Sequence, residues 1–298
     1  MKYIIGIDCG GTKTEAEAYS LDGTLISRRQ TGFGNLIVDY TTGMANIKAS
    51  IEGIFQELPQ EDCLEMTLGI AGIDSGGLQD RAINDLSVYN VPTKIFNDGQ
   101  LAHYGIVKGQ DGITVTAGTG SVILGLSNNE WFRVGGWGHL FGDEGSAYFI
   151  AKSGIQQALR ESDNNQEPSE LSKAIFSYFD VTTVFELTQK VYQLSKGEIA
   201  SAAVVVANLT YSNDMAKQII ETAGIDIAKG ILQIVNKMPK TDKKIPIGLN
   251  GSVVEKNKEV LAAVRKMLDD NHLEYELQLK EASCAKGAYY LYQRNGDQ

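Results

Sequence analysis

Cysteine, proline and long apolar runs are all scarce in this sequence, and two of these shortages exclude classes of protein. Its three cysteines (Cys9, Cys63 and Cys284) lie far apart and form no CxxC pair, which argues against a disulfide scaffold and against a cysteine zinc site. No segment approaches the roughly 18 apolar residues of a membrane helix, and the apolar run before Asp8 is too short for a signal peptide. These features predict a reduced, cytoplasmic protein.

Positive charge is also in short supply. The chain has 27 lysines and arginines against 37 aspartates and glutamates, a net charge of −10. Nucleic acids and anionic membranes need a basic face, so neither is an expected partner. Small phosphates remain possible partners, because local backbone dipoles bind them without help from net charge. We therefore expect a small-molecule partner.

Glycine, in contrast, is abundant. The sequence has 32 glycines and 5 prolines in 298 residues, so glycine reaches about 11% against a usual ~7%. Excess glycine without excess proline does not indicate disorder. It indicates many places where the backbone turns tightly or approaches a ligand. The length itself favours two domains.

One pattern of strands and turns occurs twice. Residues 3–8 read as a buried strand, followed by a glycine turn, a strand, the hairpin signal Asp22-Gly23 and a returning strand. Residues 113–135 repeat this order, with a hairpin turn at Asn128-Asn129. The self-similarity predicts a duplicated β-meander, one copy per domain. The expected domains are 1–111 and 112–282, with a C-terminal helix at about 283–298.

The remaining segments alternate between helices and strands. Apolar residues at helical spacing predict a helix over 39–58, and a shorter helix over 77–87 separates the strands 66–72 and 93–98. The second half is rich in helices, expected at 144–160, 168–179, 182–195, 198–211 and 213–238. A strand at 245–251 then runs into another helix. The expected fold class is α/β.

Three glycine-containing loops follow predicted strands: Gly10-Gly11-Thr12, Gly118-Thr119-Gly120-Ser121 and Gly251-Ser252. Consecutive glycines let backbone N–H groups converge on an anion, and a hydroxyl adds a donor. No Walker A sequence is present, and a strand rather than a helix follows the first loop. A plain tight turn would explain any one loop, but three together favour a nucleotide.

Acidic residues mark two further places. Asp98 ends a strand at Asn97-Asp98-Gly99, where a carboxylate is either a base for a hydroxyl nucleophile or the N-cap of a helix over 99–107. The segment 135–146 holds five glycines, Trp137 and the pair Asp143-Glu144. Capping of the next helix would explain the two acids, whereas an aromatic surface beside carboxylates is what a sugar site requires.

These motifs, in this order, resemble N-acetylglucosamine kinases of the BadF/BadG/BcrA/BcrD-type ATPase family, within the actin/sugar-kinase/Hsp70 superfamily. The resemblance spans nearly the whole chain, and its most specific part is the Gly-Trp-Gly…Gly-Asp-Glu-Gly block at 136–145. It implies two duplicated actin-like (ribonuclease H-like) domains with ATP and sugar in the cleft between them, and a C-terminal helix, at about 283–298, that packs back on the first domain. It also implies the cofactors ATP and Mg²⁺, and a possible homodimer.

The resemblance carries roles to individual residues. Asp98 would be the catalytic base and would also contact the sugar, and Asp8 would act on Mg²⁺ through water. ATP and its phosphates would lie on Gly10, Gly11, Thr12, Lys13, Gly118, Thr119, Gly251 and Ser252. The sugar would also contact Asn35, Gly120, Ser121, Gly136, Trp137 and Asp143. Two positions depart from the pattern: Val122 replaces a polar residue that is often asparagine in the animal enzymes, and Ala71-Gly72-Ile73 lacks a serine.

The implied reaction is phosphoryl transfer from MgATP to the C6 hydroxyl of an amino sugar, most simply N-acetylglucosamine. Glucosamine, N-acetylmuramic acid and N-acetylmannosamine are alternative substrates for the same pocket. A different class is the ATPase activator of a radical acyl-CoA dehydratase, which holds an iron–sulfur cluster between cysteines across a dimer. A third possibility is a sugar-sensing module without catalysis. Asp98 and the two phosphate loops favour the kinase.

Overall fold

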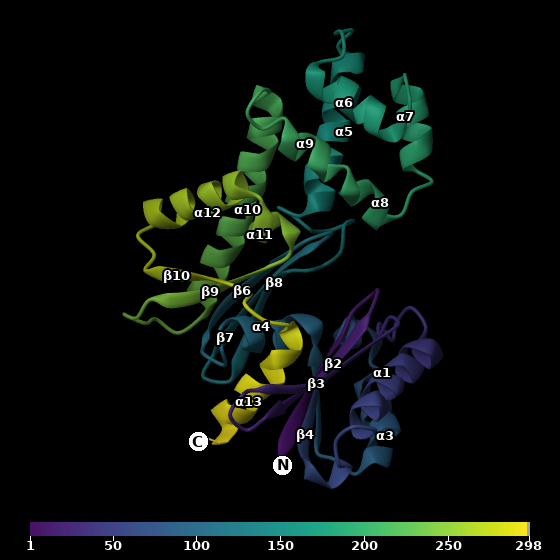
Figure 1. Cartoon of the computed structure of the whole chain (residues 1–298). Coiled ribbons are helices and arrows are strands. Elements are labelled where there is room, and N and C mark those ends of the chain that lie inside the picture. The colour runs from purple at the N-terminus through teal and green to yellow at the C-terminus, as the bar shows by residue number, and fades with distance from the viewer. Residues whose placement is uncertain (297–298) are drawn as a thin grey trace. The chain divides into compact units, whose positions relative to one another are not determined.

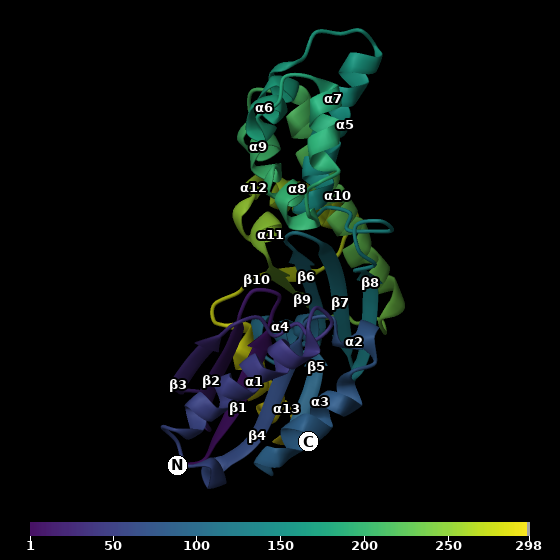
Figure 2. The same ribbon diagram turned by 90° about the vertical axis from the view of Figure 1, so that its right-hand side faces the viewer.

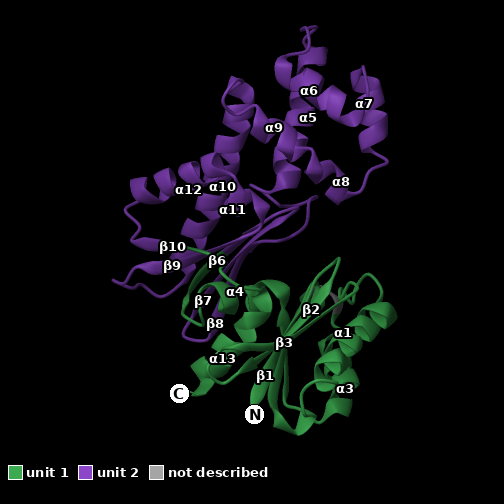
Figure 3. Cartoon of the chain, viewed as in Figure 1, with its two compact units in different colours: residues 1–114, 278–298 green, residues 115–277 purple. Residues whose placement is uncertain are grey.

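The computed structural model describes residues 1–296, except for the side chains of residues 75 and 76. Residues 297 and 298, which the expected C-terminal helix includes, lie outside the described residues. The chain divides into two compact units, residues 1–114 with 278–298 and residues 115–277 (Figure 3). The division falls within strand β6 (Gly112–Ala117) and within strand β10 (Tyr275–Leu279).

The first unit is built on a five-stranded sheet in the order β3-β2-β1-β4-β5 (Figure 2). The strands are β1 (Tyr3–Cys9), β2 (Thr14–Ser20), β3 (Leu25–Thr31), β4 (Cys63–Ile70) and β5 (Thr93–Asn97). β1 is antiparallel to β2 and parallel to β4, and β4 is parallel to β5. The helices are α1 (Tyr40–Phe55), α2 (Ile73–Gly76), α3 (Gln79–Leu86), α4 (Asp98–Ile106) and α13 (Gly287–Gly296), with 3₁₀ turns at 60–62, 87–89 and 284–286.

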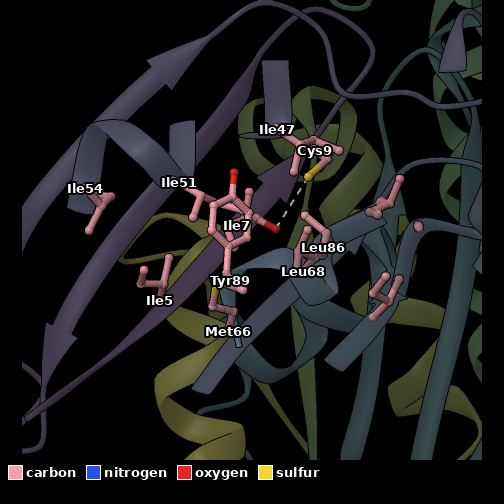
Figure 4. Close-up of a cluster of buried hydrophobic side chains, with 14 of the residues drawn as sticks. Ile5, Ile7, Cys9, Ile47, Ile51, Ile54, Met66, Leu68, Leu86 and Tyr89 are labelled. Carbon is pink, nitrogen blue, oxygen red and sulfur yellow. Dashed lines mark hydrogen bonds between the residues drawn. The ribbon is translucent and has the colours of Figure 1, made fainter. Parts of the chain in front are cut away.

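Alternation along β1 assigns its side chains to the two faces of the sheet. Ile5, Ile7 and Cys9 belong to a buried cluster that also contains Ile47 of α1 and Leu86 of α3 (Figure 4). The neighbour Ile4 belongs instead to a second cluster, with Leu101 of α4 and Ala288 of α13. The unit is therefore a three-layer α/β arrangement, in which α1 and α3 cover one face and α4 and α13 the other.

A glycine in β1 brings the end of the chain onto this sheet. A Cβ on Gly6 would lie 1.8 Å from the Ala285 carbonyl oxygen, so only glycine allows the 3₁₀ turn before α13 to touch β1. α13 packs against α4 and β1 in the first unit.

The second unit repeats the first sheet. Its order is β10-β9-β6-β7-β8, with β7 (Ser121–Ser127), β8 (Glu130–Gly135) and β9 (Ile245–Asn250) beside β6 and β10. A meander of three strands forms one side of each sheet, and the two later strands join at the other side of the meander's first strand. The predicted duplication and the α/β fold class are confirmed. At the β7–β8 hairpin, Asn128 and Asn129 have φ of 50° and 66°, the conformation that a two-residue I′ turn requires.

The helices of the second unit are α5 (Ala147–Asp163), α6 (Glu170–Phe179), α7 (Val184–Val191), α8 (Lys196–Ser201), α9 (Ala203–Asn208), α10 (Asp214–Lys237), α11 (Ser252–Lys256) and α12 (Lys258–Asp270) (Figure 1). The long α10 packs against β7, β8 and α12. Its buried residues recur at helical spacing, as the sequence predicts.

Several elements differ from the expectations. The helix expected at 182–195 is the shorter α7, and the helix expected at 198–211 is two short helices, α8, which begins after the cap Ser195, and α9. The helix expected from 144 begins at 147, where Ser146 is the cap. The sequence pattern did not predict β10, because its short run of alternating polar and apolar residues carries a weak signal.

Candidate functional site

The predicted site residues fall into two groups, one in each unit. In the first unit, Asp8, the turn 10–13 and Asp98 lie where strands β1 and β5 end or just beyond them, and Asn35 lies in the loop after β3. β1, β4 and β5 are parallel neighbours, so their carboxyl ends share one edge of the sheet. This edge is where α/β folds bind ligands.

Asp98 is not the helix cap that its position also allowed. Asn97 is the N-cap of α4, accepting a hydrogen bond from Gln100 N–H, and the Gln100 side chain completes the capping box by accepting from Asn97 N–H. Asp98 is the first helical residue, and its carboxylate accepts the neighbouring Gly99 N–H at 2.9 Å. The interpretation of Asp98 as a cap is therefore wrong, because asparagine takes that task and leaves the carboxylate for other chemistry.

The two carboxylates at this edge have higher pKa values than ordinary surface acids. Burial, followed by repulsion from Asp98, raises the pKa of Asp8 to about 6. The pKa of Asp98 is also raised, chiefly because surrounding protein displaces water, with a smaller contribution from the charge of Asp74. A carboxylate with a raised pKa is a stronger base than a free one, which is what abstraction of a hydroxyl proton needs.

The first glycine turn is closed by its own backbone. Gly10 N–H donates to the Lys13 carbonyl at 2.9 Å, and Gly34 N–H donates to the Gly10 carbonyl at 2.9 Å. Thr12, which lies between Gly10 and Lys13 in the turn, is exposed. The Lys13 ammonium pairs with Glu15, which lies further along β2. Because Asn35 directly follows Gly34, the hydrogen bond from Gly34 to Gly10 keeps Asn35 close to the turn.

The donor set at this edge fits Mg²⁺ held partly by its substrate. Among residues 1–296, no group of three or more histidines, cysteines or acids forms a metal cage. Mg²⁺ keeps several waters and commonly uses one or two carboxylates plus substrate phosphates. Asp8 and Asp98, two carboxylates that repel one another, offer this incomplete set.

In the second unit, the loop after β6 is fastened to the start of α5. Gly118 N–H donates to the Gly120 carbonyl at 2.9 Å, and Ala147 N–H donates to the Gly118 carbonyl at 2.8 Å. Tyr148 N–H reaches the Thr119 carbonyl at 3.3 Å. The loop is thus held at the N-terminal end of α5, where the helix dipole favours anions.

The third predicted loop packs directly on this one. Gly251 has φ of +99°, and a Cβ there would lie 2.5 Å from the Ala117 carbonyl oxygen. Only glycine permits this contact. Thr119 and Ser252 line one cavity of about 520 Å³, whose other walls come from α5, α8, α9 and α11 and from residues at the start of α12. This volume is within the range of small-molecule sites.

Asp143 is not a helix cap either. Ser146 caps α5, whereas Asp143 is 3% exposed and has φ of +66°. Its Oδ1 accepts Ser121 N–H at 3.1 Å, and its Oδ2 pairs with the Lys196 ammonium at 2.6 Å. The capping interpretation of Asp143 is wrong. A buried carboxylate in left-handed backbone is a strained arrangement of the kind that clusters at functional sites.

The segment before Asp143 presents an aromatic surface. Gly135 and Gly136 have φ of 72° and 74°, and they turn the chain so that Trp137 is 66% exposed. The Arg133 guanidinium lies 4.7 Å from the centroid of the Trp137 ring and donates to the carbonyls of both glycines. An exposed tryptophan held in place in this way suits stacking on a sugar ring.

Lys196 is a residue of this group that no sequence motif selects. Its ammonium contacts Asp143, and a Cβ on Gly120 would lie 2.7 Å from it. One local signal does exist. Lys196 is the first residue of α8, where the helix dipole disfavours a cation. A lysine at this position therefore indicates an acidic partner that offsets the unfavourable interaction with the dipole.

The two departures from the motif pattern have different structural settings. Ile73 is 2% exposed and belongs to the buried cluster of the first unit, so packing explains it. Val122 is partly exposed and lines a cavity beside Trp137. Of the two, only Val122 lines one of the cavities described here.

The chain belongs to the BadF/BadG/BcrA/BcrD ATPase family, which it matches over residues 5–289. A Clostridium acetobutylicum protein named N-acetylmuramic acid/N-acetylglucosamine kinase is 28% identical to it, over 98% of each chain. A Dictyostelium discoideum protein named N-acetyl-D-glucosamine kinase is 24% identical, over 96% of each.

A solved structure from Chromobacterium violaceum, described as a candidate N-acetylglucosamine kinase, shares the fold. It has a TM-score of 0.76 and 22% identity, covering 98% of this chain and 99% of that one. Within the described residues of our structure, no helix is both long and apolar enough to span a membrane.

Proposed function

We propose that this protein is an ATP-dependent amino sugar kinase that converts N-acetylglucosamine to its 6-phosphate. The observation that carries the proposal is the position of the loop 118–121. Thr119 lines the 520 Å³ cavity, while two residues later Ser121 N–H holds the buried Asp143 carboxylate. One short loop thus joins a cavity of nucleoside size to a carboxylate suited to sugar hydroxyls. The Clostridium and Dictyostelium relatives carry this activity in their names.

The nucleotide occupies the glycine loops. The adenosine lies in the cavity of the second unit beside Gly251 and Ser252, and the phosphates extend to Gly118 and Thr119. The turn of the first unit, Gly10 to Lys13, lies on the phosphates and contributes the exposed Thr12 hydroxyl and the N–H groups after Gly10, whose own N–H is taken by the Lys13 carbonyl. Asp8 would hold Mg²⁺ through water, and the ion would supply positive charge to offset the charge on the phosphates.

Apolar and polar side chains together hold the sugar. Trp137 stacks on its apolar face, and Asp143 accepts hydrogen bonds from its hydroxyls. Gly120, Ser121 and Gly136 supply backbone contacts in the second unit, and Asn35 and Asp98 supply polar contacts in the first.

Asp98 is the base. Its carboxylate accepts the proton of the C6 hydroxyl as O6 attacks the γ-phosphorus, and the bond from that phosphorus to the β–γ bridging oxygen breaks. The products are the sugar 6-phosphate and ADP. Asp98 carries the proton at the end of the step and returns it to water. Such a base contributes about 10²–10⁴-fold.

The cysteines do not favour the alternative role as a dehydratase activator. Cys9 and Cys63 are buried in the core of the first unit, where they cannot reach a cluster shared with a second chain, and only Cys284, among the cysteines of the described residues, is partly exposed. ATP as the donor fits a cytoplasmic location, and a homodimer is the expected assembly of such a kinase.

Sugar-dependent release of ADP tests the proposal. The protein is incubated with MgATP and N-acetylglucosamine, glucosamine, N-acetylmannosamine or no sugar, and ADP is measured by a coupled assay. Strong stimulation by N-acetylglucosamine is expected. ADP release that ignores every sugar would contradict the kinase function and favour the activator class.

A further inference from the structure

Two glutamates of β2, Glu15 and Glu17, are buried and have no part in the mechanism proposed above. Their exposed fractions are 4% and 3%. They alternate along the strand with Ala16 and Ala18, which belong to the apolar cluster on the other face of the sheet, so the glutamates are on the face that α4 and α13 cover. Replacing buried ion pairs by apolar residues is often neutral or stabilising. Stability alone therefore does not account for two charged side chains at these positions.

Glu15 is directly opposite a carboxylate of the proposed site. In the pairing of β1 with β2, Asp8 and Glu15 are partners in register. Residues paired in this way project from the same face of the sheet with Cβ atoms about 5 Å apart, and like charges there are destabilising. A cation between the two carboxylates removes the repulsion. The pairing therefore favours a positive charge at the sheet edge where Asp8 and Asp98 lie.

Lys13, at the end of the first glycine turn, supplies this cation. Its ammonium donates to Glu15 Oε2 at 3.2 Å. Burial and the charge of Asp98 raise the pKa of Asp8, and the charge of Lys13 opposes that rise, so the ammonium acts on both carboxylates. An ammonium has three N–H donors. The hydrogen bond to Glu15 therefore leaves donors for a phosphate.

Glu15 also has partners other than Lys13. The Arg28 guanidinium contacts Glu15 Oε1, and its Nε lies 3.5 Å from Glu17 Oε1. The Ser283 hydroxyl, in the segment before α13, donates to Glu15 Oε2 at 3.4 Å. These partners hold the Glu15 carboxylate in place without help from Lys13. The lysine can therefore turn its other donors to a ligand while the carboxylate stays fixed.

We propose that Glu15 is a positioning residue for phosphoryl transfer, which holds the Lys13 ammonium at the sheet edge so that it meets the transferred phosphoryl group already in place. The inference rests on the proposed kinase function and deepens it. Cations aimed in advance at developing charge lower the barrier to phosphoryl transfer. A lysine without such a partner loses conformational entropy when it reaches the same position. Glu15 touches neither the nucleotide nor the sugar, and it acts only through Lys13.

The test measures kcat and the KM values for MgATP and N-acetylglucosamine in a double-mutant cycle. Lys13→Met removes the ammonium and is expected to lower kcat about 100-fold. Glu15→Gln keeps the size of the side chain but releases the ammonium, so kcat should fall about 10-fold, with the KM for the sugar unchanged within about 2-fold. The double variant is expected to be no slower than Lys13→Met, because Glu15 then has no ammonium to position.

Glu17→Gln is the matched control. Glu17 is on the same strand and face and is as deeply buried, but among residues 1–296 its ion pair is with Arg28 and not with Lys13. Its glutamine variant is expected to keep kcat within about 2-fold of the wild type, and its melting temperature reports the cost of a buried amide.

Glu15→Asp covers the case in which glutamine at this position prevents folding. It keeps the negative charge beside Arg28 and draws the carboxylate back from Lys13 by one methylene group. We expect kcat to fall about 3- to 10-fold when this change is made in the wild type. Made in Lys13→Met, the same change is expected to leave kcat as it is.

The outcomes distinguish the positioning role from the function on which it rests. A wild type whose ADP release ignores the sugar contradicts the kinase proposal itself. An active wild type whose Glu15→Gln and Glu17→Gln variants lose kcat equally overturns the positioning role alone, because the loss then follows from burying an amide. A further 10-fold loss when Glu15→Gln is added to Lys13→Met also overturns it, since Glu15 then acts independently of the lysine. Unchanged kcat in Glu15→Asp does the same.

Discussion

The two glycine loops occupy matching positions in a duplicated fold, yet their surroundings differ. The turn 10–13 of the first unit ends a strand that carries Asp8, on a sheet edge shared with Asp98. The loop 118–121 of the second unit has a cavity on one side and an ion-paired carboxylate on the other. Duplication thus supplied two similar loops, and the neighbours of each decide its chemistry. In the proposed mechanism, the first unit supplies the base and the second unit supplies most of the binding contacts.

The backbones of the loops also differ in how tightly they are packed. A Cβ on Gly11 or Gly118 would meet no atom within 4 Å, whereas a Cβ on Gly251 would strike the Ala117 carbonyl. Gly11 and Gly118 thus have open space beside them, whereas Gly251, behind the second loop, is required by packing. The predictions below test this division, beginning with the largest expected effect.

Asp98→Asn should lower kcat by about 10²–10⁴-fold. The amide cannot accept the hydroxyl proton, but it keeps the size and most hydrogen bonds of the carboxylate, so calorimetric titration with N-acetylglucosamine should show nearly unchanged affinity. In the wild type, kcat should fall as the pH drops toward the raised pKa of Asp98, because the protonated carboxyl is no longer a base. Turnover near the wild-type rate in the variant would remove Asp98 from the mechanism.

Gly251→Ala should destabilise the second unit by about 2–3 kcal/mol, since it combines a left-handed backbone with a clash. The melting temperature should fall by roughly 5–10 °C, and the KM for ATP should rise about 10-fold as the displaced loop loses its contacts. Gly118→Ala is the comparison, because its Cβ has room and its melting temperature should change little. If both variants melt alike, the packing argument is wrong.

Lys196→Met should raise the KM for the sugar by about 10-fold and change the KM for ATP less. The buried Asp143 carboxylate would lose its cation and relax away from Ser121. Lys196→Arg keeps the charge and should recover most of the affinity. A rise confined to the KM for ATP would instead place the lysine on the phosphates.

Asp8→Asn should make the protein more stable by about 1 kcal/mol at pH 7 without Mg²⁺. A carboxyl whose pKa is about 6 when folded binds more protons than it does unfolded, so it costs stability as the pH rises from about 4 to 6, and that cost remains above pH 6. Partial contact with solvent reduces the effect. Thermal melts at pH 4 and pH 7 check the sign, because the gain should vanish at the lower pH.

The sequence predicted the duplicated α/β fold well, since glycine turns and hairpin signals recur in the same order in both halves. It could not decide the role of Asp98, because asparagine and aspartate are adjacent and either can cap a helix. Only the structure shows that Asn97 does so. The role of Lys196 could not be predicted for a different reason. Its partner Asp143 is 53 positions earlier in the chain, and the ion pair between them depends on the tertiary fold.

The sequence also could not show which of the two departures from the motif pattern bears on a site. Ile73 and Val122 depart from the pattern in the same way, but Ile73 is a core residue and Val122 lines a cavity. Periodicity over a helix as short as α2 (Ile73–Gly76) cannot tell a buried position from an exposed one.

The most direct test of the account is the fate of the γ-phosphate, followed by NMR of the products formed from MgATP and N-acetylglucosamine. We expect a phosphorus–carbon coupling at C6 in the wild type and its absence in Asp98→Asn. Formation of inorganic phosphate and ADP, with the sugar left unmodified by the wild type, would contradict the claim that this duplicated ATPase fold is a sugar kinase.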